Sequence, residues 1–186
     1  MIYRKVFKSS VPEFIEVRVH DNGAATYDIR TLKDEPDPQP FEVGAPLAAK
    51  IFDLAAQLNH FKDVDLDTKR RIANLGEKTF RFERGNQSSE VTFNYTINGA
   101  ANQLIMIFEG LARQQEHLQL LQHRIRYDRL GVNNALLNFE SDLNRKILPE
   151  PERLLPVLEQ ISADSRIVDI ARQRARAIIE RLRHPK

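Results

Sequence analysis

The stretch FIEVRVHDNGAATYDIRT, residues 14–31, decides the fold of the first half of the chain. Apolar and polar residues alternate on both sides of its central Asp-Asn-Gly, which is the pattern of two half-buried strands joined by a tight turn. A two-residue loop would set Val17 opposite Asp28 and mix the two faces. A three-residue loop with Gly23 in the left-handed conformation sets Val17 opposite Tyr27 and keeps apolar and polar residues apart. The sequence therefore predicts this second register, which also pairs Val19 with Ala25 and Ile15 with Ile29.

A proline-rich segment and a helix are expected after this hairpin. Residues 33–46 contain four prolines, and they predict an extended, acidic connector without regular structure. Pro46 fits the first turn of a helix. That helix is expected to run to about Phe61, with an apolar stripe made of Leu47, Ile51, Leu54, Ala55 and Leu58.

A second hairpin is expected at about residues 79–96. Phe80 and Phe82 alternate with polar residues, and turn residues at 85–88 lead into a second strand. The apolar residues of that second strand are Val91, Phe93 and Tyr95. Both hairpins have one apolar and one polar face, which is typical of an antiparallel sheet with helices on one side.

The second half of the chain has a helical pattern. An apolar residue recurs at every seventh position, at Leu104, Leu111, Leu118, Ile125, Val132 and Phe139. Such a repeat indicates a helical stripe that stays against a partner, either within the chain or in a second copy. Gln115, Gln122 and Arg129 stand at companion positions where a coiled-coil dimer needs apolar residues, so packing within the chain is favoured.

The long helical pattern is expected to break near Gly131. Leu130-Gly131-Val132 is typical of a glycine cap, which would end a first helix at about residue 130. Asn133 can cap the next helix, which runs to about Lys146. The alternative is one rod through Gly131, since glycine in a helix interior costs only about 1 kcal/mol.

Two more helices complete the predicted architecture. A short helix is expected around residues 154–161, and a last one at 166–183, capped by Asp164 or Ser165. The fold class is therefore α+β: a four-stranded antiparallel sheet from two hairpins, one helix between them, and a C-terminal region of three to four helices. We expect the sheet and its helix in residues 1–98 and the helical region in residues 99–186, packed as one compact unit.

Composition excludes several classes of function. The chain has no cysteine, so it has no disulfide, thiolate zinc site or nucleophilic thiol. Its seven glycines are too widely spaced for a phosphate-binding loop. There is no apolar run long enough to span a bilayer and no signal-peptide core at the start. We expect a cytoplasmic protein as written, or an exported one if Met1 replaces a removed signal peptide.

Carboxylates and histidines predict neither a metal site nor a cofactor. Asp63, Asp65 and Asp67 alternate as in a calcium loop. However, Thr68 stands where the sharp turn needs glycine, and Asn74 stands where the loop needs a bidentate glutamate. We therefore interpret this segment as a solvated acidic turn.

One group of residues is a candidate for proton transfer. Glu116, His123 and Tyr127 share a helix face, whereas His117 and His123 point about 120° apart and cannot bind one metal from a regular helix. A solvated face with a salt bridge is the favoured interpretation. A hydrolase-like enzyme with an unrecognised site is therefore only the third hypothesis, and no catalytic residue is predicted.

Basic residues gather at the C-terminal end, where residues 165–186 carry seven basic and two acidic side chains. Three arginines lie within about 40° of one another on the last helix and could contact the phosphates of nucleic acid or an anionic surface. Asp169 and Glu180 are placed to pair with two of them, so a solvated face is the alternative. These candidate anion contacts are Arg172, Arg176 and Arg183.

The polar face of the predicted sheet is the candidate interaction surface, although solvation alone is the alternative for each of its residues. The favoured function is that of a non-enzymatic protein-interaction or scaffold protein, with another protein or a second copy as partner. Nucleic-acid binding is the second hypothesis. The candidate interaction residues are Glu16, Arg18, Thr26, Asp28, Arg81, Thr92 and Asn94.

The spacing of several apolar residues supports a resemblance over residues 14–96. The residues that carry it are Ile15, Val17, Asn22-Gly23, Tyr27, Ile51-Phe52, Leu54, Leu58 and Phe61. In this arrangement the chain resembles small uncharacterised bacterial domains of hairpin–helix–hairpin type. The resemblance implies an α+β sheet-and-helix module, commonly exported and without an established activity, and it assigns no functional residue.

Overall fold

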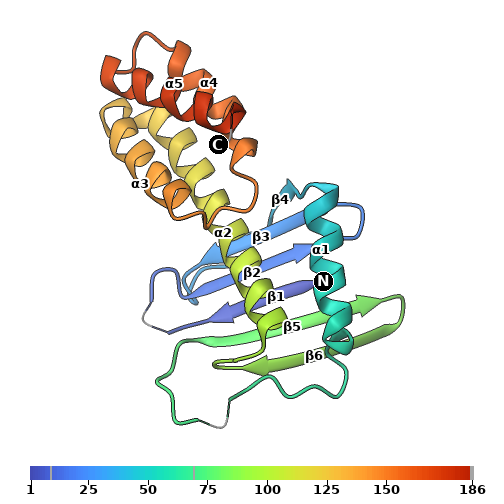
Figure 1. Cartoon of the computed structure of the whole chain (residues 1–186). Helices are drawn as coiled ribbons and strands as arrows, with labels where there is room; N and C mark the ends of the chain where they lie inside the picture. The colour runs from blue at the N-terminus through green and yellow to red at the C-terminus, as the bar shows by residue number, and fades with distance from the viewer. Residues whose placement is uncertain (9, 69, 185–186) are drawn as a thin grey trace. The chain divides into compact units, whose positions relative to one another are not determined.

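A computed structural model describes residues 1–8, 10–68 and 70–184, and the chain divides into two compact units. Unit 1 comprises Met1–Ala112 and unit 2 comprises Arg113–Lys186. Helix α2, Gly99–Tyr127, gives its first part to unit 1 and the remainder to unit 2. Figure 1 shows the elements along the chain.

Unit 1 is built on an antiparallel sheet. Helix α1, Ala45–Gln57, has Pro46 in its first turn and carries its buried residues on one stripe, as expected. It ends before the predicted Phe61, which lies in a separate 3₁₀ turn, Asn59–Phe61. The order of the strands across the sheet is β4-β3-β2-β1-β5-β6. The strands are β1 (Ile2–Val6), β2 (Phe14–Val19), β3 (Ala24–Arg30), β4 (Gln39–Glu42), β5 (Glu77–Arg84) and β6 (Gln87–Phe93).

The prediction of an α+β fold with an antiparallel sheet is confirmed, but the predicted count of four strands is wrong, since the described sheet has six. Strand β1 gives a weak sequence signal, because Ile2 and Tyr3 are both buried and interrupt the alternation. Strand β4 lies inside residues 33–46, which were expected to lack regular structure. Pro40 is compatible with it because β4 is an edge strand, where one side of the backbone needs no hydrogen bond.

The predicted register of the first hairpin is confirmed. Val17 lies opposite Tyr27, and Ile15 opposite Ile29. Gly23 has a φ of +86°, and a Cβ atom at this position would lie 2.5 Å from the carbonyl oxygen of Val43. Glycine is therefore required here both by the left-handed backbone and by the close approach of the chain that follows β4.

Both helices of unit 1 pack on the same face of the sheet (Figure 1). Phe80 of β5 lies at the centre of this core, fully buried. Its ring centroid lies 5.2 Å from that of Phe61, 5.4 Å from Phe93 and 5.6 Å from Tyr3. Among the described residues of unit 1, no helix packs on the other face of the sheet, which we term the open face.

Unit 2 is helical. It contains the end of α2, followed by α3 (Val132–Asn144), α4 (Leu155–Ala163) and α5 (Asp169–Arg183). With α2, the described part of the chain after residue 98 thus holds four α-helices, within the predicted three to four. The seven-residue stripe is covered within the chain: Leu104 and Leu111 lie in the core of unit 1, and Ile125, Val132 and Phe139 lie in that of unit 2.

The predicted break of the long helix is confirmed, but its mechanism is different. Gly131 has a right-handed φ of −75°, so it is not a left-handed cap. Instead, the Asp128 carboxylate accepts a hydrogen bond from the Gly131 N–H at 3.0 Å and closes a short 3₁₀ turn. Asn133 consequently lies inside α3 rather than at its cap.

The start of the last helix was also predicted incorrectly. Helix α5 begins at Asp169, not at residue 166, and its N-cap position is Val168. Asp164 organises the turn before the helix, because its carboxylate accepts hydrogen bonds from the backbone and the side chain of Arg166. When an aspartate side chain accepts a hydrogen bond from the backbone N–H two residues later, it forms a local turn that competes with the start of a helix.

Candidate interaction surfaces

The open face of the sheet carries six of the seven residues that were expected on the candidate interaction surface. They are Glu16, Arg18, Thr26, Asp28, Arg81 and Thr92, whose neighbours in the strands face the core. Asn94 follows the end of β6, and its amide binds the backbone of Ala73 and Leu75. Its hydrogen bonds thus anchor the loop before β5.

Glu16 lies beneath two arginines at the middle of the open face. Its carboxylate pairs with Arg4 at 2.7 Å and with Arg18 at 2.9 Å. The Glu16 side chain is 14% exposed, whereas those of Arg4 and Arg18 are 47% and 45% exposed. Burial alone would raise the pKa of Glu16, but the hydrogen bonds from both arginines outweigh it and lower the pKa below its usual value. The exposed charge over β1 and β2 is therefore that of guanidinium groups.

The other half of the open face is acidic. Glu77, Glu83 and Glu90 lie on β5 and β6 and are exposed, and Arg81 is the basic residue among them. Arg81 pairs with Glu83 at 2.8 Å. The open face therefore has a basic half on β1–β2 and an acidic half on β5–β6.

The three arginines predicted to contact an anion are engaged within unit 2. Arg172 pairs with Asp169 at 2.8 Å, as expected from their spacing. Arg183 pairs with Glu159 of α4 at 2.5 Å, and Arg176 donates to the Ser162 carbonyl at 3.3 Å. The last two contacts hold α5 against α4. The two ion pairs offset the charge of Arg172 and Arg183, and the bond to Ser162 occupies a donor of Arg176.

The candidate proton-transfer group of α2 is brought together only in part. The rings of His123 and Tyr127 lie 5.0 Å apart, and Tyr127 is 75% exposed. Glu116 is directed to Arg113, at 3.5 Å. The three residues therefore do not form one cluster: Glu116 pairs with Arg113, whereas His123 and Tyr127 contact each other on a solvated helix surface.

A buried polar cluster in unit 2 was not predicted. The Asp142 carboxylate of α3 binds the Arg113 guanidinium at 2.7 Å and the His117 Nε2 atom at 2.9 Å, and both Asp142 and His117 are buried. Burial alone would raise the pKa of Asp142, but the bonds from Arg113 and His117 lower it. The sequence position of His117 could have predicted its burial, because His117 lies one turn before the buried Leu121 and therefore shares the apolar face of α2.

The stability of unit 2 is expected to fall on acidification below about pH 6.5, the ordinary pKa of histidine. Burial lowers the pKa of His117, with only partial compensation from Asp142. The unfolded chain therefore takes up the proton first, and stability decreases as the pH falls from about 6.5 toward the lower pKa of the folded state. Urea unfolding at several pH values measures this loss. The variant His117→Gln should lack it, and an unchanged pH dependence would contradict this role of His117.

Two charged side chains of unit 1, those of Glu109 and Lys78, make hydrogen bonds to other residues of the same unit. Glu109 accepts hydrogen bonds from the Tyr3 hydroxyl at 2.8 Å and from the Lys5 ammonium at 2.9 Å. The Lys78 ammonium donates to the carbonyls of Leu75, Gly76 and Asn94. Burial lowers the pKa of Lys78, but these three carbonyls occupy all three of its donors. Both groups therefore connect structural elements.

Two carboxylates of the acidic turn at residues 63–67 likewise bind backbone N–H groups of the chain. The Asp67 carboxylate accepts from the N–H groups of Asn94 and Tyr95, and the Asp65 carboxylate accepts from that of Asp67. Within the described ranges, no cluster of three or more histidine or carboxylate side chains could hold a metal ion.

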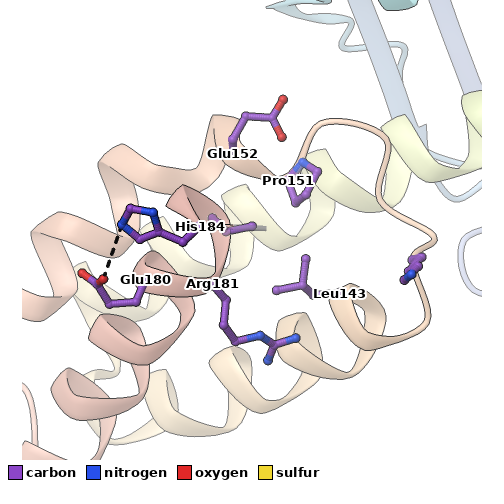
Figure 2. A pocket seen from close by; sticks show the side chains of 8 residues that line it. Leu143, Pro151, Glu152, Glu180, Arg181 and His184 are labelled. Atoms are coloured by element: carbon purple, nitrogen blue, oxygen red, sulfur yellow. Dashed lines mark ion pairs between the residues drawn. The ribbon is translucent and has the colours of Figure 1, made fainter. Parts of the chain in front are cut away.

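A pocket of about 760 Å³ lies in unit 2 between the end of α3, the segment that follows it, and the end of α5. Figure 2 shows that side chains from all three parts surround it. Its lining combines apolar and charged side chains: Leu143, Lys146, Pro151, Glu152, Glu180, Arg181, Leu182 and His184.

Comparisons with protein-family models, with curated proteins and with solved structures find no match to the chain. In the part of the chain that the structure describes, no helix is both long and apolar enough to cross a bilayer. The geometry of the two units is therefore the basis on which a function is proposed.

Proposed function

We propose that this protein is a non-enzymatic scaffold that associates with a second copy of itself through the open face of its sheet. The observation that carries the proposal is the division of this face into a basic and an acidic half. On β1–β2, Arg4 and Arg18 share Glu16, which lies beneath them. A surface with two halves of opposite charge is complementary to its own copy when one copy is turned by half a revolution.

The register of the strands defines how two such faces would meet. Arg18 lies opposite Ile2, Ile2 opposite Arg81, and Arg81 opposite Glu90, so these four residues form one row across β2, β1, β5 and β6. A two-fold axis along the boundary between β1 and β5 lays β2 of one copy on β6 of the other. Arg18 then faces Glu90 of the second copy, and the symmetry repeats this pair.

The internal use of the polar clusters supports a non-enzymatic role. Lys78 directs its three donors to backbone carbonyls, and the Asp142 carboxylate is held by Arg113 and His117. A reactive group needs a free lone pair or proton that a substrate can reach. Binding of nucleic acid by α5 has less support, because its candidate arginines already have partners in unit 2.

The proposal is tested by the molar mass in solution, measured by light scattering during gel filtration. At about 50 mM salt and high protein concentration, the mass should rise toward twice the chain mass, and about 500 mM salt should reverse it, because salt screens exposed charges. Arg18→Glu should weaken the dimer at least about tenfold, because the symmetry brings two like-charged pairs together. Arg126→Glu, an exposed change on α2, is the matched control and should leave the mass unchanged. An Arg18→Glu variant that dimerises as the wild type does would contradict this interface.

A further inference from the structure

We propose that the pocket of unit 2 binds a short peptide that has free ends and an apolar side chain. This site lies on α3 and α5 and is independent of the open sheet face. Its volume of about 760 Å³ falls within the range of about 300–1,000 Å³ that is usual for ligand sites. A tripeptide belongs to the same size class as the ligands of such sites.

The apolar part of the pocket suits an aliphatic side chain. It is lined by Leu143 of α3, by Leu182 of α5 and by Pro151, which begins the 3₁₀ turn after α3. All three residues are half-buried. Figure 2 shows Leu143 and Pro151 beside the space that Arg181 also borders. Leu143 and Leu182 also pack against the core of unit 2, so the floor of the pocket is continuous with that core.

Part of the charged lining is already paired. The Arg181 guanidinium binds Glu140 at 3.1 Å and Asn144 at 2.6 Å. His184 lies 4.0 Å from Glu180, a contact drawn in Figure 2. Arg181 is thus bonded within unit 2, whereas the contact of His184 with Glu180 is a long one between two exposed side chains.

Two lining charges of opposite sign lack such partners. Among the described residues, no ion pair or side-chain hydrogen bond involves Lys146 or Glu152. They flank the apolar lining from either end of the segment that joins α3 to the next 3₁₀ turn. A free α-carboxylate is complementary to Lys146, and a free α-ammonium to Glu152, which defines a ligand with both charges and an apolar centre.

The backbone of Lys146 provides a second observation. Its φ is +55°, and its N–H donates to the Leu143 carbonyl while that of Ile147 donates to the Asp142 carbonyl. This pair of bonds is the Schellman ending of a helix, in which the left-handed position usually holds glycine. Lysine is disfavoured there by its Cβ atom. Lys146 therefore lines the pocket from a position where glycine would suit the backbone better.

Lys146→Gly separates binding from folding. This variant should raise Tm by about 2–4 °C, because glycine suits the left-handed backbone. It should also weaken binding of the probe, the tripeptide Ala-Leu-Ala with free ends, by at least about tenfold, because one charged contact is lost. Binding is measured by NMR from the methyl shifts of Leu143 and Leu182, and Lys50→Gly on α1 is the control that should leave these shifts intact.

The charge assignment is tested with capped peptide and with the acidic residue. The acetylated and amidated form of Ala-Leu-Ala should bind about a hundredfold more weakly than the free form, since it lacks both charged contacts and each is worth about a factor of ten. Glu152→Gln should weaken binding of the free tripeptide by about tenfold, because it removes one of these two contacts. The inference is overturned if the free tripeptide shifts neither methyl group, if capping has no effect, or if Lys146→Gly binds normally.

Discussion

Replacing Phe80 by alanine should lower the free energy of unfolding by about 3–5 kcal/mol, the largest effect expected in unit 1. Phe80 is fully buried and contacts the rings of Tyr3, Phe61 and Phe93, which come from β1, the turn after α1, and β6. Its removal leaves a cavity that cannot collapse without moving all of these elements. Urea unfolding followed by circular dichroism measures the loss.

Phe14→Ala is the matched control for this substitution. Phe14 is a half-buried phenylalanine of β2 on the open face, with the Arg30 guanidinium 4.1 Å from the centre of its ring. Its replacement should cost only about 1–2 kcal/mol, from partial burial and one cation–π contact. Equal losses for the two variants would contradict the assignment of the core to the face that carries α1 and α2.

Replacing Asp142 by asparagine should destabilise unit 2 by about 2–3 kcal/mol. The substitution keeps the shape of the side chain but removes the charge that binds Arg113 and His117. Both neighbours bind the same carboxylate oxygen, Oδ2, so the amide oxygen of asparagine can still accept from them. The amide NH₂ group then takes the place of Oδ1, which lies 3.7 Å from the Arg145 guanidinium, so a donor faces a donor there. Urea unfolding at about pH 7.5 measures the loss, because His117 is then largely neutral in the folded and the unfolded chain.

Glu140→Gln is the control for the effect of burial. Glu140 also binds two basic groups, Arg174 at 2.6 Å and Arg181 at 3.1 Å, but its side chain is 24% exposed. Solvent screens such a pair, so the loss should be below about 1 kcal/mol. A loss as large as that of Asp142→Asn would show that burial does not govern the contribution of these carboxylates.

The sequence predicted elements whose signal is local and regular. In the hairpin around Gly23, apolar and polar residues alternate strictly, and only one register of the turn keeps them on separate faces. Helix α1 has a proline in its first turn and a single apolar stripe. Strands β1 and β4 escaped because their signals depend on context. Tyr3 contacts Phe80 and Phe108, far away in the sequence, and Pro40 is tolerated only because β4 lies at an edge.

The candidate surfaces show the same division between local and long-range information. The faces of Glu16, Arg18 and Arg81 followed from strand alternation alone. The division into a basic and an acidic half did not, because it depends on β1 pairing with both β2 and β5. Similarly, the contact of Asp142 with His117 joins two helices across 25 residues of sequence, and helix periodicity does not specify which faces of two helices meet.

Association of two copies through opposite charges on the open sheet face is tested most directly with two charge-reversed variants. Arg18→Glu and Glu90→Arg should each give monomers by light scattering, near the chain mass of 21.5 kDa. In a homodimer of either variant, the two-fold symmetry would place like charges together at both ends of the interface.

An equimolar mixture of these two variants should restore the dimer. At one end of the mixed interface, the glutamate introduced at position 18 faces the arginine introduced at position 90 of the other chain. At the other end, the unchanged Glu90 of the first chain faces the unchanged Arg18 of the second. Both pairs are therefore attractive. We expect a mass for the mixture near twice that of the chain, and a mixture that stays at 21.5 kDa would contradict the proposed association.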